Sequence, residues 1–282
     1  MTKLTSLLAP NLRIKPSKLY VKNLQKVAHF YQDLVRLQTL ETTDSHVVLG
    51  HDQTPVLELI AKPEFTNAPL PSAGLFHNAV VYSSRAELAR TVYNILVNEP
   101  ASFEGSADHL VSEAFYFHDP EFNGLELYFD RPKETWQWQN GSIKMDTLYL
   151  DPEAFIMRYG GDKPDASLEL GHVHLRVGDV PTARIFYVDQ LGFDATADIG
   201  SALFVSVGGY HHHMAMNTWQ SKGVGPRVPG LGLAEVKLIL PADGSIDTLA
   251  NRLTASKLPF EQKKGDLFVD DPWGNKLVFA TV

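Results

Sequence analysis

Three residues with metal-binding side chains occupy comparable places in a sequence that repeats itself. His77 and His172 each lie at the start of the first predicted strand of a repeat unit, and Glu126 lies in a last strand. Two imidazoles and one carboxylate suit a divalent metal with open coordination positions, and this donor set is typical of non-haem Fe(II) oxygenases. A single histidine at a strand start is more often a hydrogen-bonded core residue. The prediction of a metal site therefore rests on the coincidence of all three positions.

A second cluster of titratable side chains follows in the same predicted unit as His172. Three consecutive histidines, His211, His212 and His213, lead into a run of apolar residues. We expect these histidines on a strand, where side chains alternate, so that His212 faces one side and its two neighbours the other. An imidazole titrates near neutral pH and can accept or release a proton there. The alternation leaves open which of the three faces the site, and a surface or core run of histidines is the alternative.

Further polar side chains accompany the predicted ligands. Tyr116 precedes Glu126 by ten residues, on the strand before it, and its hydroxyl could hydrogen-bond a substrate oxygen or the ring could simply pack in the sheet. His109 enters the same strand, where we expect it to be a turn residue. His174 shares a strand face with His172 and is expected to support it from behind.

The elements that would position these side chains repeat along the chain. Segments 19–37 and 175–193 share residues at a spacing of 156 positions, and segments 119–125 and 271–277 share residues at a spacing of 152. Alternating apolar residues and helical spacing within each repeat predict four βαβββ units, which begin near residues 14, 74, 169 and 231. The predicted fold class is α+β, with curved mixed sheets that form open barrels.

Two homologous halves follow from these repeats. We expect an N-terminal half over residues 1–130 and a C-terminal half over residues 169–282, each with two units. The segment 131–168 joins them and is too apolar for a free linker, so it is expected to pack on the body. The predicted ligands lie in the second and third units only. The corresponding places in the first and fourth units hold Pro16, Ala234 and Val278.

The composition argues against several classes of protein. The chain has 282 residues, of which 44% are hydrophobic, and a formal net charge of −8, so it can bury a core and lacks the basic surface that nucleic-acid binding needs. It contains no cysteine, which removes disulfides, thiolate metal sites and cysteine nucleophiles. No apolar run is long enough to span a membrane, and the first residues do not fit a signal peptide. We therefore expect a cytoplasmic protein without nucleic-acid or membrane partners.

The runs 119–128, 171–180 and 191–193 resemble the vicinal oxygen chelate superfamily, which includes glyoxalase I, bleomycin-resistance proteins and type I extradiol dioxygenases. The resemblance spans nearly the whole chain. Segments 74–77, 84–89, 108–114 and 136–138 are most similar to bacterial catechol 2,3-dioxygenase-like proteins.

This resemblance implies a role for each candidate residue. The two metal histidines of the family fall on His77 and His172, and its glutamate falls on Glu126. The acid–base histidine of the extradiol enzymes, aligned through Ala215, falls on His212, and their active-site tyrosine falls on Tyr116.

The sequence also departs from the family in two places. The best-known extradiol enzymes hold their site in the third and fourth units, whereas here the fourth unit lacks ligands. The second and third units must therefore share one barrel across the two halves. Most members also carry glycine in the turn where this chain has Phe122.

The activity that the resemblance implies is extradiol ring cleavage of catechol or a substituted catechol with O₂. Fe(II) is the expected metal and Mn(II) the second choice, while Zn or Ni could occupy the same ligands without dioxygenase activity. A glyoxalase-like metal-dependent lyase or isomerase is one alternative, although it would want a second carboxylate where the histidine run stands. A metal-free binding protein of the bleomycin-resistance type is another. The expected partners are a small aromatic diol and O₂, and a homo-oligomer is compatible with the sequence.

Overall fold

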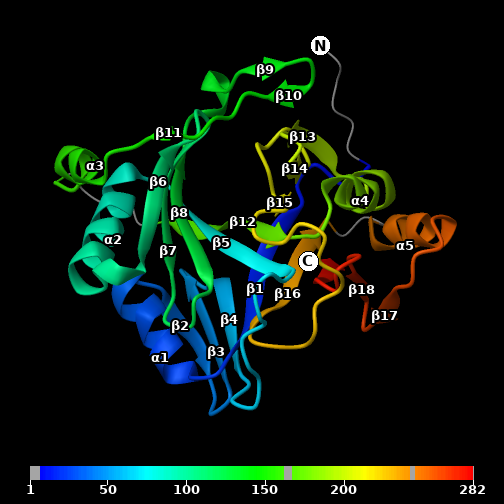
Figure 1. Ribbon diagram of the computed structural model, residues 1–282, viewed down its shortest axis with the longest axis horizontal. Coiled ribbons are helices and arrows are strands. Elements are labelled where there is room, and N and C mark those ends of the chain that lie inside the picture. Colours follow the sequence, from blue (N-terminus) through cyan, green and yellow to red (C-terminus); the bar gives the residue numbers. More distant parts are fainter. Residues whose placement is uncertain (1–6, 162–166, 242–244, 282) are drawn as a thin grey trace.

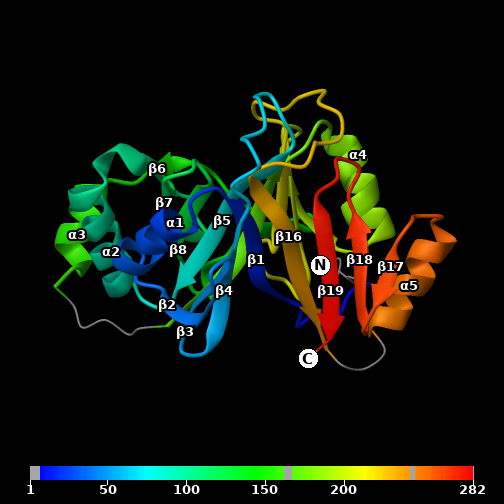
Figure 2. The same ribbon diagram turned by 90° about the horizontal axis from the view of Figure 1, so that it is seen from below.

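The computed structural model describes residues 7–161, 167–241 and 245–281 of the chain. Two large curved sheets lie side by side in it, and the helices lie at the periphery (Figures 1 and 2). The fold is α+β, and the four predicted βαβββ units begin at Arg13, Gly74, Leu168 and Gly232. The predicted fold class is confirmed, and each predicted start lies within one residue of the observed strand. Among the described helices, none is long and apolar enough to cross a membrane.

The first and fourth units form an eight-stranded sheet, here called sheet A, in the order β17-β18-β19-β16-β1-β4-β3-β2. The first unit contains β1 (Arg13–Val21), α1 (Leu24–His29), η1 (Phe30–Leu34), β2 (Gln38–Thr42), β3 (His46–His51) and β4 (Thr54–Ala61). The fourth unit contains β16 (Gly232–Leu240), α5 (Ser245–Ala255), β17 (Glu261–Lys263), β18 (Asp266–Asp270) and β19 (Lys276–Thr281).

The second and third units form a nine-stranded sheet, here called sheet B, in the order β11-β6-β7-β8-β5-β12-β15-β14-β13. The second unit contains β5 (Gly74–Tyr82), α2 (Arg85–Asn98), η2 (Pro100–Ser102), β6 (Phe103–Asp108), β7 (Ser112–His118) and β8 (Gly124–Asp130). The third unit contains β12 (Leu168–Arg176), α4 (Val180–Arg184), η4 (Ile185–Gln190), β13 (Asp194–Asp198), β14 (Ala202–Ser206) and β15 (Met214–Asn217).

Each sheet is joined across the two halves of the chain. The first strands of two units pair antiparallel, β5 with β12 in sheet B and β1 with β16 in sheet A. The expectation that the second and third units share one barrel is therefore confirmed. Sheet B curves, so that β6–β8 and β13–β15 face each other across the hollow of the sheet (Figure 1).

The segment between the halves contains η3 (Lys133–Thr135), β9 (Trp138–Gln139), β10 (Ser142–Ile143), β11 (Leu148–Tyr149) and α3 (Pro152–Tyr159). Strand β11 extends sheet B by pairing with β6, and Trp136 and Phe155 are buried. Asn140 and Gly141 both have positive φ and form the tight turn between β9 and β10. The division at 1–130, 131–168 and 169–282 stays a prediction.

Two equivalent turns hold the units together within each half. Asp119 accepts hydrogen bonds from the backbone N–H groups of Glu121 (2.8 Å) and Asn123 (3.0 Å), and the hydroxyl of Tyr31 donates to its other oxygen (3.3 Å).

The equivalent turn of the C-terminal half is built in the same way. Asp271 accepts from the backbone N–H groups of Trp273 and Asn275, and from the hydroxyl of Tyr187 (3.0 Å). Each tyrosine comes from the helix of one unit and each aspartate from the last turn of the next, so these buried bonds connect the two units.

Candidate metal centre

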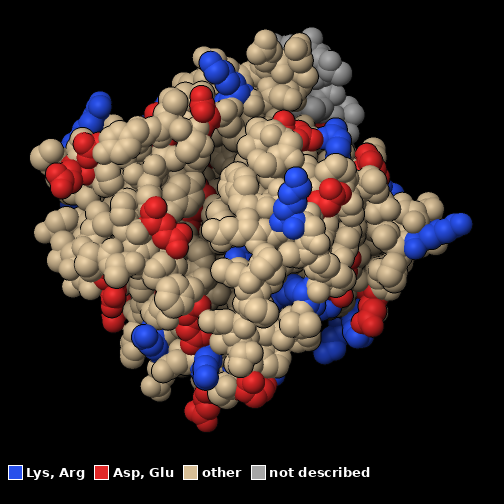
Figure 3. All heavy atoms as spheres, in the orientation of Figure 1, with Lys and Arg blue, Asp and Glu red and all other residues tan. Residues whose placement is uncertain are grey.

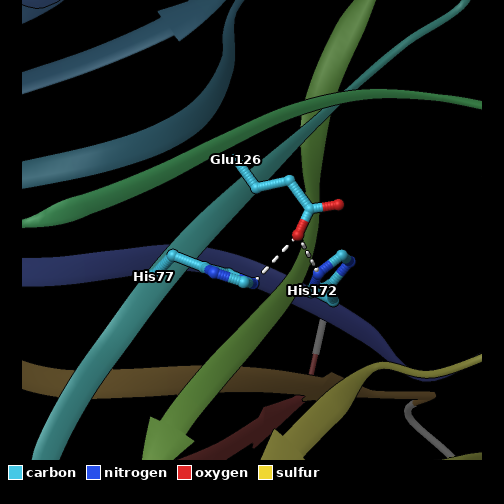
Figure 4. A group of neighbouring side chains, drawn as sticks. All are labelled: His77, Glu126 and His172. Atoms are coloured by element: carbon cyan, nitrogen blue, oxygen red, sulfur yellow. Dashed lines mark hydrogen bonds and ion pairs between the residues drawn. The ribbon is translucent and has the colours of Figure 1, made fainter. Parts of the chain in front are cut away.

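Three neighbouring strands of sheet B place the predicted ligands on one face. Ala79 in β5 pairs with Glu126 in β8 on one side and with His172 in β12 on the other. His77 lies two residues before Ala79, and side chains two residues apart in a strand point to the same face. The three side chains consequently converge, as the close-up shows (Figure 4).

The donor atoms of this group lie close together and are buried. Nε2 of His77 lies 2.9 Å from Oε2 of Glu126, and Nε2 of His172 lies 3.2 Å from the same oxygen. One donor atom from each residue falls within 4.8 Å of the other two. Burial alone would raise the pKa of Glu126, but the charge and hydrogen bond of His172, together with the adjacent imidazole of His77, outweigh it and hold that pKa well below its usual value. The carboxylate is therefore ionised.

The histidine protonation also suits metal binding. Burial, with smaller contributions from the neighbouring His77 and His211, lowers the pKa of His172 to about 4 against the opposing effect of Glu126. A neutral imidazole and an ionised carboxylate are the forms that bind metals. Nε2 of His77 is buried and makes no hydrogen bond despite its short distance to Glu126. A donor nitrogen that faces a carboxylate without bonding to it fits a divalent cation between the two.

Gly171, which precedes the predicted ligand His172, leaves room for the side chain of Tyr128. The pairing of β12 with β5 shifts register between Leu170 and His172, which leaves Gly171 in an irregular position. A Cβ atom on Gly171 would lie 1.9 Å from the hydroxyl of Tyr128, so only glycine fits there. The ring of Tyr128 packs 5.0 Å from the ring of His172.

The histidine run lies in a different setting from the one expected. We expected His211, His212 and His213 on a strand with alternating faces, but β15 begins only at Met214, and the three residues lie in the turn after β14. The strand prediction was wrong, because Gly208 and Gly209 both have positive φ and end β14 before the histidines.

Within this turn the three histidines have separate partners. Nδ1 of His211 lies 2.7 Å from Nδ1 of His212, while Nδ1 of His213 lies 2.8 Å from the hydroxyl of Ser206. His212 lines the cavity described below, and its ring lies 4.1 Å from that of His172. Burial, followed by the nearby His172 and His211, lowers the pKa of His212 well below its ordinary value.

Tyr116 points toward the same site and is held by His109. Nε2 of His109 lies 2.6 Å from the hydroxyl of Tyr116, and Nδ1 lies 2.7 Å from the backbone carbonyl of Asp146. Because a carbonyl can only accept, Nδ1 carries the hydrogen, and Nε2 of the neutral ring accepts from Tyr116. Burial and then the carboxylate of Glu126 raise the pKa of Tyr116 well above its usual value, so the hydroxyl stays protonated.

Sequence reasoning missed Asp130, which lies 2.8 Å from Nε2 of His211 through Oδ1. Its other oxygen accepts from the hydroxyl of Tyr210 at 2.7 Å. Asp130 shares its strand face with Glu126 and Tyr128, and this alternation was a signal that could have identified it. His174, expected to support the site, is buried, and its Nε2 lies 3.0 Å from the side-chain nitrogen of Asn217.

Two of the three predicted ligands, His77 and Glu126, line a cavity of about 570 Å³, and His172 lies directly behind them beside Glu126. His77, Glu126, Tyr116 and His212 all line it, and further lining residues come from both sides of the curved sheet and from the connecting segment. The molecular surface is hollowed on this face (Figure 3). A small aromatic molecule can therefore reach the predicted metal position, the predicted acid–base histidine and a tyrosine hydroxyl at once.

Comparison with known proteins identifies the family. The family described as "Glyoxalase/Bleomycin resistance protein/Dioxygenase superfamily" matches residues 169–279. A protein of Bacillus subtilis (strain 168) named catechol-2,3-dioxygenase is 36% identical over 267 residues, which cover 91% of this chain and 92% of the relative. The chain belongs to this superfamily, and the family resemblance seen in the sequence is confirmed. The relationship supports a dioxygenase-type enzyme.

Solved structures share the fold at low sequence identity. Glyoxalase I from Zea mays is 15% identical, with a TM-score of 0.59 over 96% of this chain and 92% of that chain. A Bacillus subtilis (subsp. subtilis str. 168) protein provisionally described as a dioxygenase is 13% identical, with a TM-score of 0.63 over 95% of this chain and 84% of that chain. At these identities the likeness extends to the fold alone.

Proposed function

We propose that this protein is an extradiol dioxygenase that opens the ring of catechol or a substituted catechol with O₂, at a divalent metal held by His77, Glu126 and His172. One observation carries the proposal. Two buried imidazoles and one ionised carboxylate converge on one point, and two of these three side chains, His77 and Glu126, line a cavity with room for an aromatic ring. The 36% identity to a protein named catechol-2,3-dioxygenase supports the same reaction.

The donor set agrees with the proposed metal. Two histidines and one carboxylate leave coordination positions open for a diol and O₂, and Fe(II) is the metal most associated with this set. When bound, the metal would act as a Lewis acid toward the diol oxygens and supply the electron chemistry with O₂. Mn(II) is the second choice, and Zn or Ni would bind without supporting turnover.

The remaining side chains would bind and orient the diol. His212 is neutral at pH 7 because burial lowers its pKa, so its ring can accept a proton from a diol hydroxyl and return it later. Tyr116 donates to His109, which leaves its hydroxyl oxygen free to accept a hydrogen bond from the substrate. The apolar parts of the wall would reduce the amount of water around a bound ring.

A glyoxalase-like isomerase receives less support from the same geometry. That chemistry would want a second carboxylate ligand, and the potential metal-binding group found among the described residues holds Glu126 as its one carboxylate. Where a second carboxylate would be expected, the histidine run stands instead.

Metal loading followed by an aerobic assay tests the proposal. Metal-free protein is loaded with Fe(II) under nitrogen, and its metal content is measured before air and catechol are added. We expect about one Fe(II) per chain and a yellow ring-fission product, and the zinc-loaded protein as control should give none. Full iron occupancy without product from catechol or any simple alkylcatechol would overturn the proposal.

A further inference from the structure

Part of the cavity wall is apolar. It is lined by Val111, Ile143, Met145, Ile199, Phe204 and Trp219. Val111 and Ile143 belong to a small hydrophobic cluster that is separate from the main core. Strand β10 of the connecting segment brings Ile143 to this wall, so the joint between the two halves also shapes the cavity.

Two of these apolar side chains remain exposed although they line a concave site. Ile199 is 61% exposed and Trp219 is 40% exposed. Exposed apolar surface in a pocket gains free energy when an apolar ligand covers it. The cavity of about 570 Å³ also lies within the range of ~300–1,000 Å³ that holds drug-sized ligands, so it exceeds the needs of one unsubstituted ring.

Away from the predicted metal position, the charged side chains that line the cavity are acidic. Glu104, Asp146 and Asp198 line it at exposed positions, Asp198 is paired with Arg184 at 3.6 Å, and no Lys or Arg stands among the described lining residues. A carboxylate on the ring substituent, away from the metal, would lose water beside these groups without a Lys or Arg of the lining as partner. Figure 3 shows acidic atoms at the edge of the hollow.

We infer that the cavity selects catechols whose ring substituent is uncharged and apolar, and discriminates against catechols that carry a carboxylate. This inference rests on the proposed function and adds the substrate class to it. The substituent would lie against Ile143, Met145 and Ile199, where the apolar wall meets the acidic rim.

Binding to zinc-loaded protein under nitrogen tests this selectivity without turnover. Calorimetric titration compares 4-ethylcatechol with 3,4-dihydroxyphenylacetate, which differ chiefly in the carboxylate, and includes catechol itself. We expect the ethyl compound to bind at least about tenfold more tightly than the acid. Equal or reversed affinities, with catechol bound, would overturn the selectivity and leave the proposed function standing. Absence of binding by all three, together with inactive iron-loaded protein, would overturn the proposed function itself.

A cation at the apolar rim should relax the discrimination. Ile199→Lys places a positive charge on an exposed wall position, and we expect it to tighten 3,4-dihydroxyphenylacetate binding by about fivefold or more. Glu41→Gln is the matched control, because it makes the same change in net charge at an exposed position of β2 in sheet A. Equal tightening in both variants, or none in Ile199→Lys, would show that this wall does not set the selectivity.

A separate observation concerns a chain of hydrogen bonds that ends at His212. Oδ1 of Asp130 lies 2.8 Å from Nε2 of His211, and Nδ1 of His211 lies 2.7 Å from Nδ1 of His212. A carboxylate accepts hydrogen bonds, so Nε2 of His211 carries a hydrogen, and when the ring carries only this hydrogen its Nδ1 is an acceptor. His212 must then donate from Nδ1, which leaves Nε2 without a hydrogen and available to a molecule in the cavity.

We propose that Asp130 and His211 are positioning residues that set the tautomer of His212. The carboxylate of Asp130, at the start of this chain of hydrogen bonds, decides which nitrogen of His212 carries the hydrogen. The two short contacts hold the His212 ring against the cavity. Tyr210 donates to the second oxygen of Asp130, so it does not compete with His211 for Oδ1.

Nitrogen NMR on the metal-free protein tests the tautomer directly. With ¹⁵N-labelled histidine, and the His212 signals identified by their loss in His212→Gln, we expect Nε2 of His212 to show the shift of an unprotonated nitrogen. Asp130→Asn, whose amide can donate, should reduce that preference.

Kinetics of the iron-loaded enzyme tests the same proposal. Asp130→Asn should lower kcat at least about tenfold with little change in KM or metal content. Tyr210→Phe, which leaves the Asp130–His211 contact in place, should change kcat less than about threefold. An unchanged tautomer and kcat in Asp130→Asn would overturn the proposal.

Discussion

Sheets A and B have the same strand arrangement but carry different side chains at equivalent positions. In sheet B, His77 pairs with His174 between two first strands, and in sheet A the equivalent pair is Glu235 with Lys18. Glu126 pairs with Ala79, whereas Val278 pairs with Lys237. The register therefore makes Glu235 the counterpart of His77. The expectation of Ala234, made from the sequence, was wrong by one residue.

In sheet A, ion pairs occupy the region equivalent to the potential metal site of sheet B. Nζ of Lys18 lies 2.9 Å from Glu235 and 3.4 Å from Glu58. Burial opposes the charge of Lys18, but hydrogen bonds and charge from Glu235 and Glu58 raise its pKa above the usual value. One backbone frame thus supports either a cluster of ion pairs or a group of metal donors, and the side chains alone decide which.

The largest expected effect follows from removing a predicted ligand. His77→Ala or Glu126→Ala should weaken metal affinity by more than about 100-fold. Mutation of residues that only hydrogen-bond to metal ligands already weakens affinity by about 10–100-fold, and loss of a ligand itself should cost more. Glu235→Ala, at the equivalent position of sheet A, is the control and should leave metal content unchanged. Metal analysis after dialysis measures the difference. Retained metal in both sheet B variants would contradict the site.

Acidification should destabilise the metal-free protein through sheet B. Burial lowers the pKa of His172 to about 4 and that of His213 to about 3, against 6.5 for an ordinary histidine. Between pH 6.5 and 4 the unfolded chain binds more protons than the folded one, so stability falls as pH falls, by about 1.4 kcal/mol per pH unit for each such histidine.

Urea unfolding of metal-free protein at pH 7, 6 and 5 measures this dependence. His213→Gln should reduce the slope by the share of one histidine, since His213 lies outside the predicted ligands. A free energy of unfolding that rises on acidification in this range would contradict the buried neutral histidines.

The equivalent Asp turns should contribute similarly in both halves. Tyr31→Phe and Tyr187→Phe each remove a buried hydroxyl that donates to an aspartate, and each should cost about 1–3 kcal/mol of unfolding free energy. Metal content should stay unchanged, because these turns hold units together and do not contact the ligand cluster. Chemical denaturation checks the cost, and a loss confined to one half would show that the halves are not equivalent.

The smallest effect concerns one turn residue in each half. Phe122 has φ of 62°, a region that costs most residues about 1–2 kcal/mol, and its counterpart Gly274 has φ of 78°. Phe122→Gly should stabilise the protein by less than about 1 kcal/mol, because relief of strain is partly offset by the greater freedom of the unfolded chain. Gly274→Ala should destabilise it. Thermal unfolding would register the opposite signs.

Much of this architecture could be predicted because the chain repeats. Alternating strands and the Asp-Pro turns gave the four units and their starts, and the comparison between units singled out His77, Glu126 and His172. The prediction of a strand through the histidine run was wrong, because the chain turns at Gly208 and Gly209. This pair of glycines is itself a turn signal in the sequence.

Other features depend on distances that a sequence does not contain. The contact between Asp130 and His211 joins residues 81 positions apart. Ala234 is itself a bulge residue, because the pairing passes from Lys18–Glu235 to Leu19–Leu233 and skips it, and such bulges follow from packing rather than from residue pattern.

The cross-paired sheets also constrain when an ion can be captured during synthesis. His77 and Glu126 emerge well before His172, and the third donor reaches them only when β12 docks on β5. A ribosome-bound N-terminal half would therefore offer an incomplete set of donors. Tight binding of the ion would therefore occur only after the two halves have assembled, and an incompletely folded chain would release the ion.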